Sequence, residues 1–334
     1  MTERSHLTCN IDLTTDGKRS GFLAVPQSTN SAGWAKYFVP ISVIRNGEGP
    51  TAVLFGGNHG DEYEGPVTLM NLTRELSPEQ ISGRVILMPM LNHPAVAGGT
   101  RLSPIDGVNM NRAFPGSPRD SITGQIAHYV ATEILPAADL VIDIHSGGSS
   151  MHMLPSVNMH RMENREQMDG MLAAARAWGA PYIFLYADIA GSGLLPTYAE
   201  SLGKVTLGTE MGSKAQFGVE MLRHSARVRN VLHHAGILKE CPNDPGTTEP
   251  LVVAAEDEQD YIMSPSSGIY EPFFEIGDAV EAGQAVGQLH SIEHPERDPE
   301  KVFAASSGIL FTRRSVPLTK QGECLAVITR EVKV

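Results

Sequence analysis

The stretch TAVLFGGNHGDE (51–62) decides how this chain folds. Its first half is a run of apolar residues, which predicts a buried β-strand that ends in two glycines. Its second half places a histidine and two acidic residues in the turn behind that strand. After Glu64, apolar residues recur at three- and four-residue spacing as far as Ser77 and Pro78, which predicts a helix that ends there. The sequence therefore predicts a buried strand, a tight turn and a helix in succession.

The same alternation continues outside this stretch. Further apolar runs predict buried strands at 84–91, 140–145, 182–186 and 204–210. Helical spacing between them predicts helices at about 121–135, 165–178, 192–202 and 218–238. The segment 92–118 is rich in glycine, proline and asparagine and predicts a long loop of the kind that is often functional. Strands that alternate with helices predict an α/β fold, with a largely parallel sheet flanked by helices.

The two ends of the chain follow a different pattern. Residues 1–48 carry strand-like runs and predict an N-terminal β segment, and PNDPGTTEP (242–250) has the composition of a linker. Beyond the linker, two similar stretches each place a serine and a glycine before a strand, a glycine turn and a second strand. This weak repeat predicts a small all-β unit. We therefore expect a main domain over 1–245 and a β-barrel-like domain over 250–334.

The C-terminal repeat resembles the biotinyl/lipoyl hammerhead fold, whose halves carry similar serine–glycine and G-D-x-V-x-x-G-Q signals. A carrier domain of that kind presents a modifiable lysine between its halves. Here the stretch that follows GQLH (287–290) reads SIEHPE and has no lysine. We interpret the unit as a structural module, and covalent biotin or lipoate in a mass spectrum would reverse that interpretation.

Composition and charge argue against several classes of function. The formal net charge is −12 and no run of five or more basic residues occurs, so nucleic acids and anionic membrane surfaces are not expected as partners. Cys9, Cys241 and Cys324 lie far apart and do not form a C-x-x-C pair, so no disulfide framework is expected. The start of the chain lacks an apolar leader core, and no apolar run nears the roughly 20 residues that span a bilayer. We expect a cytoplasmic protein, and homo-oligomerisation stays open.

Ionisable side chains follow three of the predicted strands. His59 and Glu62 come after the quoted strand, and His145 and Glu210 end two of the others. Because the carboxyl ends of parallel strands meet at one edge of a sheet, where α/β proteins bind ligands, we expect these side chains to gather there. Two histidines and a glutamate form a donor set that binds zinc and leaves one coordination position for water. The sequence therefore predicts a catalytic metal site at this edge.

The H-x-x-E spacing of His59 and Glu62 can also be explained without a metal site. An H-x-x-E spacing arises often by chance, and most of the 12 histidines are expected at the surface or in hydrogen bonds. The methionine-rich segment 151–171 is interpreted as packing. Asp143 shares a strand face with His145, and whether the two form a hydrogen bond stays open.

Four motifs in a fixed order give the sequence a resemblance to a known family. They are GGNHGDE (56–62), GVNMNRAFPG (107–116), DIHSG (143–147) and TEMG (209–212). Over roughly residues 50–240 the chain resembles the succinylglutamate desuccinylase/aspartoacylase family, relatives of the zinc carboxypeptidases. The resemblance implies a zinc-carboxypeptidase-like mixed sheet. With its C-terminal β unit, the whole chain is most similar to the N-acetyl-diaminobutyrate deacetylase branch associated with ectoine degradation.

The resemblance implies a role for each matching residue. The implied ligands of one zinc ion per chain are His59, Glu62 and His145. Glu210 matches the catalytic carboxylate that takes a proton from water. Asn111 and Arg112 match the pair that holds a substrate carboxylate, for which a planar guanidinium is well suited. Arg101 resembles the arginine that helps to stabilise the oxyanion, although no tight motif surrounds it.

The expected activity is zinc-dependent hydrolysis of the amide bond in a small N-acyl amino acid. The branch implies deacetylation of N-acetyl-L-2,4-diaminobutyrate to acetate and L-2,4-diaminobutyrate in ectoine catabolism. No residue encodes an acetyl rather than a succinyl group, so a desuccinylase, an aspartoacylase-type deacylase and a carboxypeptidase stay open. A non-catalytic binding or carrier module is the remaining alternative.

Overall fold

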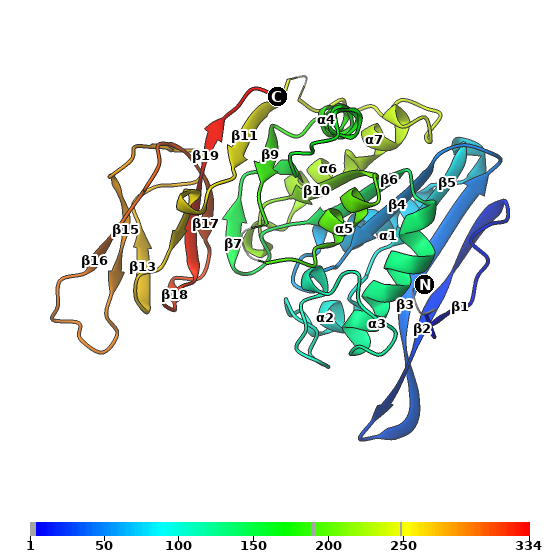
Figure 1. Cartoon of the computed structure of the whole chain (residues 1–334), viewed down its shortest axis with the longest axis horizontal. Helices are drawn as coiled ribbons and strands as arrows, with labels where there is room; N and C mark the ends of the chain where they lie inside the picture. Colours follow the sequence, from blue (N-terminus) through cyan, green and yellow to red (C-terminus); the bar gives the residue numbers. More distant parts are fainter. Residues whose placement is uncertain (1–4, 189–190, 248) are drawn as a thin grey trace.

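The computed structural model describes residues 5–188, 191–247 and 249–334 (Figure 1). A long mixed sheet forms the centre of the molecule, and helices cover both of its faces. A smaller four-stranded antiparallel sheet lies at the C-terminal end of the fold. The expected mixed α/β fold with a separate small β sheet is therefore confirmed.

The elements have the following bounds. The strands before the linker are β1 (Thr8–Cys9), β2 (Gly17–Thr29), β3 (Ala32–Asn46), β4 (Thr51–Gly56), β5 (Gly83–Met88), β6 (Leu140–His145), β7 (Met151–Met153), β8 (Ser156–Met159), β9 (Tyr182–Tyr186) and β10 (Val205–Glu210). The strands after it are β11 (Leu251–Ala255), β12 (Tyr261–Met263), β13 (Gly268–Pro272), β14 (Ala279–Val280), β15 (Ala285–His290), β16 (Glu300–Phe303), β17 (Gly308–Arg314), β18 (Leu318–Thr319) and β19 (Cys324–Glu331). The α-helices are α1 (Glu64–Glu75), α2 (His93–Gly98), α3 (Ile122–Tyr129), α4 (Arg165–Trp178), α5 (Leu195–Ser201), α6 (Val219–Ala226) and α7 (Val228–His234).

The order of the strands places the predicted site. The main sheet runs β1-β2-β3-β5-β4-β6-β10-β8-β9-β11-β19-β17-β14, and its central strands β5, β4, β6 and β10 are parallel. Beyond the linker, β11 pairs with β9 and β19 pairs with β11, so backbone hydrogen bonds join the C-terminal part to the main sheet. The division at 1–245 and 250–334 stays a prediction.

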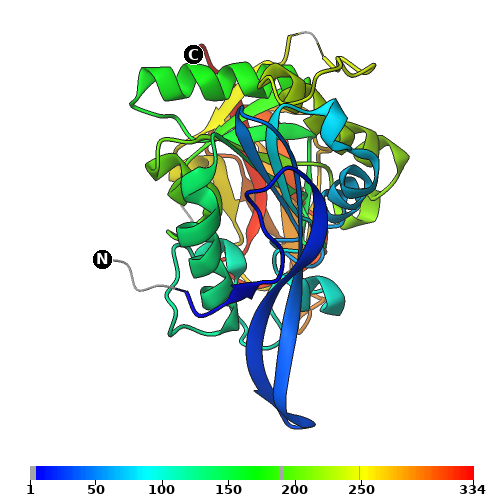
Figure 2. The same cartoon turned by 90° about the vertical axis from the view of Figure 1, so that its right-hand side faces the viewer.

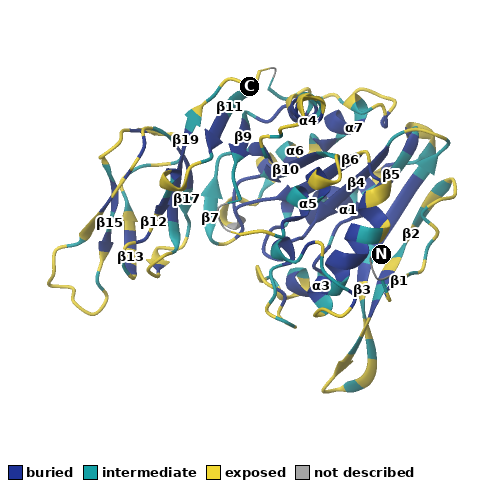
Figure 3. Cartoon of the chain, viewed as in Figure 1, coloured by how far each residue is buried: buried dark blue, intermediate teal, exposed yellow. Residues whose placement is uncertain are grey.

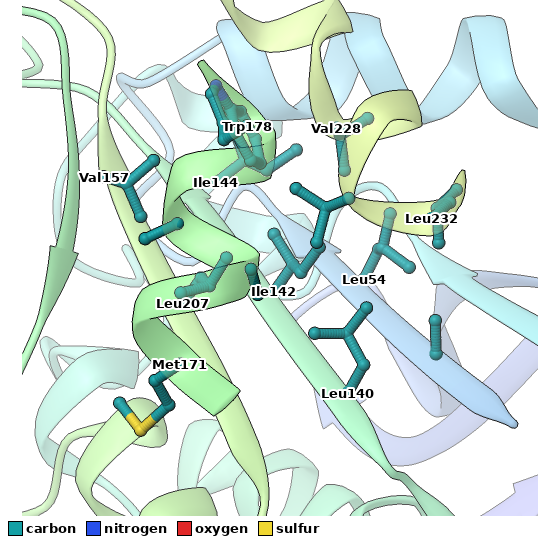
Figure 4. Close-up of a cluster of buried hydrophobic side chains, with 14 of the residues drawn as sticks. Leu54, Leu140, Ile142, Ile144, Val157, Met171, Trp178, Leu207, Val228 and Leu232 are labelled. Atoms are coloured by element: carbon teal, nitrogen blue, oxygen red, sulfur yellow. The ribbon is translucent and has the colours of Figure 1, made fainter. Parts of the chain in front are cut away.

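The central strands are buried on both faces, as their continuous apolar runs predict. On one face, Leu54, Ile142 and Leu207 pack with Trp178 of α4 and Leu232 of α7 (Figure 4). Figure 3 shows these strands as the buried centre of the molecule. Because neighbouring side chains on a strand point to opposite faces, the residues between them form a second core.

That second core lies on the other face of the sheet. Val53, Phe55 and Val141 pack there with Ile126 of α3 and Leu195 of α5. The helices on both faces are short, and the longest α-helix, α4, has 14 residues. Within the described part of the chain, no helix combines the length and the apolar character that crossing a bilayer needs.

Most expected elements are present, and α4 has the bounds expected for it. Two expectations were wrong in detail. The segment 92–118 contains the short helix α2, whose six residues end at Gly98 and are followed by Gly99, a left-handed residue with a φ of 62°. The helix expected at 218–238 is broken near Arg227 into α6 and α7. The interpretation of the methionine-rich segment as packing is confirmed for Met159, Met168 and Met171, which are buried in the core, whereas its strands β7 and β8 were not predicted. Elements this short contain too few residues for a periodic pattern to develop.

The N-terminal β segment forms a long antiparallel hairpin from β2 and β3. β3 continues into the main sheet through its pairing with β5. The far end of the hairpin projects away from the body of the molecule (Figure 2), on the side opposite to the small C-terminal sheet in Figure 1. The hairpin therefore extends the sheet at the edge far from β11 and β19.

Candidate metal centre and substrate pocket

The carboxyl ends of β4, β6 and β10 bring the predicted ligands together. One ligand atom from each of His59, Glu62 and His145 can be chosen so that all three lie within 4.8 Å of one another. All three residues are buried. In the sheet, Glu210 pairs with His145 in register, so the two side chains lie next to each other on one face. Three strand ends thus converge on one point, as the sequence predicted.

The turn after β4 is tight because of its glycines. Gly57 has a φ of +63°, which favours glycine. A Cβ atom on Gly60 would lie 1.9 Å from the carbonyl carbon of Ala95, so only glycine lets this turn pack against α2. The backbone N–H of Gly60 donates to the carbonyl of Thr100 at 3.0 Å. The glycines around His59 therefore position it by allowing close backbone contact.

Glu62 faces both histidines. Its Oε1 lies 2.8 Å from Nδ1 of His59, and its Oε2 lies 2.8 Å from Nδ1 of His145. The backbone N–H of Ser146 also donates to Oε2 at 3.2 Å. Burial raises the pKa of Glu62, but the two histidines outweigh it and hold that pKa below its usual value. Glu62 is therefore an ionised carboxylate aimed between two imidazole rings.

The outer nitrogen of each ring has its own acceptor. Nε2 of His59 lies 3.1 Å from Oδ1 of Asn109, and Nε2 of His145 lies 2.7 Å from Oδ2 of Asp143. The hydrogen bond that the sequence left open between Asp143 and His145 is therefore present. Amide and carboxylate oxygens only accept, so each Nε2 carries a proton and donates it.

This arrangement fits a metal ion. With Nε2 as donor, each neutral ring turns the lone pair of Nδ1 towards the carboxylate of Glu62, and a cation between them relieves the repulsion. Burial lowers the pKa of His145, but the charges of Asp143 and Glu62 outweigh it and raise that pKa well above its usual value. The negative charges that stabilise a proton at this point also favour a metal ion. Two imidazole nitrogens and a carboxylate are a donor set that zinc accepts.

Glu210 lies in the pocket beside these residues. Its Oε2 is buried and has no hydrogen-bond partner among the described residues. Burial, together with the charge of Glu62, raises the pKa of Glu210 to about 8. A carboxyl group that exchanges its proton near neutral pH suits general acid–base chemistry.

Arg101 also reaches the centre, although no tight motif placed it there. Its Nη1 lies 3.6 Å from Oε1 of Glu62 and 3.4 Å from Nδ1 of His59. Its side chain is 44% exposed. The guanidinium therefore lies at the mouth of the centre, where it can donate to an oxygen atom of a bound molecule.

Asn111 and Arg112 lie in a short 3-10 turn, Met110–Arg112, that lines the same pocket. Oδ1 of Asn111 accepts from the backbone N–H of Leu195 at 2.9 Å, which fixes the loop against the start of α5. Nη1 of Arg112 donates to the carbonyl of Asn111 at 2.6 Å. The loop thus holds Arg112 beside the centre.

The pocket has a volume of about 340 Å³. Its lining includes all seven predicted site residues, which are His59, Glu62, Arg101, Asn111, Arg112, His145 and Glu210. Part of its wall comes from beyond the linker, from Tyr261, Met263 and Cys324. The C-terminal strands therefore help to shape the pocket, a contribution that the sequence did not indicate.

A second charged cluster borders the pocket. Nδ1 of His160 donates to Oε2 of Glu200 at 2.6 Å, and Nε2 donates to Oδ1 of Asp188 at 3.0 Å. The His160 ring also packs on Tyr186, with 4.2 Å between the ring centroids. Burial lowers the pKa of His160, but the two carboxylates raise it to about 9. Asp188 and Tyr186 line the pocket, and the sequence indicated a role for neither of them.

The raised pKa of His160 predicts a pH-dependent stability. Its folded pKa of about 9 exceeds the ordinary 6.5, so its stabilising contribution is full below pH 6.5 and is lost as the pH rises through 9. The difference corresponds to about 3 kcal/mol. We expect the melting temperature of the wild type to fall more steeply between pH 6.5 and 9.5 than that of His160→Gln. His294→Gln, at a histidine in an exposed loop, is the control, and its melting temperature should fall with pH as steeply as that of the wild type. Identical slopes in wild type and His160→Gln would contradict the assignment.

Two residues that hold the predicted ligands and Asp143 in place could have been identified from the sequence. Asn58 and Asn109 both belong to the quoted motifs, but no role was assigned to them. Nδ2 of Asn58 donates to Oδ2 of Asp143 at 2.8 Å, and Asn109 holds His59 as described above. Both asparagines lie in motifs that carry predicted site residues, and this position could have indicated their supporting role.

Comparisons with known proteins agree with this geometry. Residues 48–235 match the family described as the succinylglutamate desuccinylase/aspartoacylase catalytic domain. The N-alpha-acetyl-L-2,4-diaminobutyric acid deacetylase of Halomonas elongata is 35% identical over 333 residues, which cover 98% of this chain and 96% of that protein. Similarity to that protein therefore includes the C-terminal strands as well as the segments that carry the candidate metal ligands.

Two solved structures have nearly the same fold. The product-bound ectoine utilization protein EutE (DoeB) from Ruegeria pomeroyi has a TM-score of 0.93 and 36% identity, and the match covers 98% of this chain and 99% of that one. The succinylglutamate desuccinylase/aspartoacylase from Rhodobacter sphaeroides has a TM-score of 0.93 and 35% identity, with 99% and 100% covered. The match extends over almost the whole chain in both cases.

Proposed function

Because this chain belongs to the succinylglutamate desuccinylase/aspartoacylase family, we propose that it is a zinc-dependent deacylase of small N-acyl amino acids. Its proposed reaction is the hydrolysis of N-acetyl-L-2,4-diaminobutyrate to acetate and L-2,4-diaminobutyrate in ectoine catabolism, in the cytoplasm. The observation that carries the proposal is Glu210 beside the buried group of His59, Glu62 and His145 in one pocket. The names of the Halomonas elongata and Ruegeria pomeroyi relatives support the choice of substrate.

His59, Glu62 and His145 would hold the zinc ion. When bound, zinc polarises an amide carbonyl and lowers the pKa of a coordinated water towards ~7. Asn109 and Asp143 keep the two histidines in the tautomer that this requires. The ligands and their hydrogen-bond partners therefore form one connected hydrogen-bond network, in which Asn109 is half-buried and the other members are buried.

Glu210 has the position and the pKa for proton transfer. It takes a proton from water as the water oxygen bonds to the acyl carbon, and it delivers a proton to the nitrogen as the C–N bond breaks. Arg101 donates to the oxygen on which negative charge develops, a contribution that typically amounts to about 2.7–4 kcal/mol. Arg112 binds the substrate carboxylate and sets the distance between the amide and Glu210.

The size of the pocket favours a small molecule over a peptide. A volume of about 340 Å³ lies at the lower end of the range for small-molecule sites. Tyr261 and Met263 of β12 line part of the pocket wall. The small volume of the pocket therefore supports a deacylase over the carboxypeptidase alternative.

A substrate panel tests the proposal. We expect the zinc-loaded protein to hydrolyse N-acetyl-L-2,4-diaminobutyrate with a kcat/KM at least about tenfold above that for N-succinylglutamate, N-acetylaspartate or a set of C-terminal dipeptides. Released acetate, succinate and amine would be measured directly. A large preference for either acidic substrate or for the dipeptides would refute the proposed reaction.

A further inference from the structure

The pocket carries charges of both signs away from the metal centre. Arg112 and Asp188 both line it, and the positive charge of Arg112 helps to hold the pKa of Asp188 below its usual value. Asp188 follows β9, at the carboxyl end of a strand that is parallel to β8. Its side chain is 25% exposed, so the carboxylate is accessible. Nothing in the proposed reaction uses this carboxylate.

Asp188 is held in place by two donors. Nε2 of His160 donates to its Oδ1 at 3.0 Å, and Oγ1 of Thr197 donates to its Oδ2 at 2.7 Å. Each carboxylate oxygen has two lone pairs, so the donors among the described residues leave one acceptor site per oxygen. The geometry therefore gives a fixed carboxylate with spare acceptor capacity at the pocket wall.

The cluster behind Asp188 keeps a negative charge. Two carboxylates, Asp188 and Glu200, face one imidazolium, His160, which leaves a net charge of −1. Tyr186 adds no charge, because burial raises the pKa of its phenol well above the usual value. Once a substrate carboxylate neutralises Arg112, the cluster still contributes this negative charge at the pocket wall, away from Arg101 at the metal centre. A cation on the substrate would balance it.

We propose that Asp188 binds an ammonium group on the side chain of the substrate, so that the pocket selects N-acyl amino acids with a cationic side chain. This inference rests on the proposed function and deepens it. Arg112 and Asp188 then bind the two ends of a zwitterion, the carboxylate and the ammonium. Acidic substrates, such as N-acetylaspartate, would place a carboxylate against Asp188 and be repelled.

A matched pair of substrates tests the role of Asp188. N-Acetyl-L-2,4-diaminobutyrate and N-acetyl-L-norvaline differ only in that a methyl group replaces the ammonium. Both would be assayed with zinc-loaded, full-length wild type, Asp188→Asn and Asp188→Ser. The two variants remove the charge with different side chains, and thermal melting identifies any that does not fold. Asp298→Asn, at an exposed aspartate in a C-terminal loop, is the matched control.

We expect the wild type to prefer the cationic substrate by at least about tenfold in kcat/KM. Loss of the charge should lower kcat/KM for that substrate about 10- to 100-fold, mainly through KM, because the ammonium binds in the ground state as well as in the transition state. For the norvaline substrate, kcat/KM of the Asp188 variants should differ from that of the wild type by less than about threefold. The Asp298→Asn control should have the same kcat/KM as the wild type with both substrates.

Two results would overturn the inference while leaving the proposed function intact. One is an unchanged substrate ratio in the folded Asp188 variants. The other is an equal loss with both substrates, which a purely structural role of Asp188 predicts. A wild type that hydrolyses neither substrate would instead refute the proposed function, and the inference with it.

Discussion

Replacement of Glu210 by glutamine is expected to lower kcat by about 10²–10⁴-fold while zinc stays bound. Glutamine has nearly the same shape but cannot take a proton from water. Glu210 is not one of the three residues whose ligand atoms cluster, so its loss should leave the metal centre assembled. The measurements are kcat on N-acetyl-L-2,4-diaminobutyrate and the metal content of the same preparation.

A suitable control for this variant is Glu48→Gln. Its carboxylate is 99% exposed and is not part of the pocket lining, so turnover should match the wild type. If Glu210→Gln retained most of its turnover at full zinc content, the role of Glu210 as the base would be rejected. Zinc loss in this variant would instead place Glu210 among the groups that hold the metal.

Replacement of Glu62 by alanine is expected to reduce the metal content from about one ion per chain to near zero and to abolish turnover. Glu62 contacts both imidazole rings, so its loss removes one ligand and leaves His59 and His145 facing each other across a buried space. Two imidazoles alone bind zinc poorly, because catalytic zinc sites use three protein ligands and this variant retains two of them. Metal analysis of dialysed protein measures this directly.

Chelation provides an independent check on the same centre. Treatment of the wild type with a chelator should abolish activity, and added Zn²⁺ should restore it; cobalt or manganese is expected to substitute in part, because these ligands accept them too. Glu48→Ala serves as the control and should keep its metal. Full zinc occupancy in Glu62→Ala would remove Glu62 from the ligand set.

Much of the fold could be predicted from the sequence because its signals are local. Strands β4, β6 and β10 are buried on both faces, so their apolar runs are nearly continuous and identify them without any knowledge of neighbours. Helix α4 is amphipathic over 14 residues and is bounded by Asn164 and Gly179, which are ordinary cap residues. The short elements α2, β7 and β8 lack such patterns, and they were missed.

The clustering of the predicted metal ligands was also predictable, for a topological reason. Once β4, β6 and β10 are parallel neighbours, their carboxyl ends must meet, and the residues that follow them must gather. The order of the four motifs then indicated that His59, Glu62, His145 and Glu210 act together in amide hydrolysis. The orientation of the rings depends on Asn109 and Asp143 and was decided only by the tertiary structure.

The sequence by itself thus determined the central strands, the group of side chains at their ends and the family of the chain, because each depends on residues that are neighbours in sequence or on one sheet edge. Only the tertiary structure decided what surrounds that group. The wall from Tyr261 and Met263, and the cluster of His160, Asp188 and Glu200, join segments that are far apart in the chain. No local spacing records such contacts, because packing between whole elements creates them. It is these contacts, rather than the metal ligands, that we expect to select the substrate.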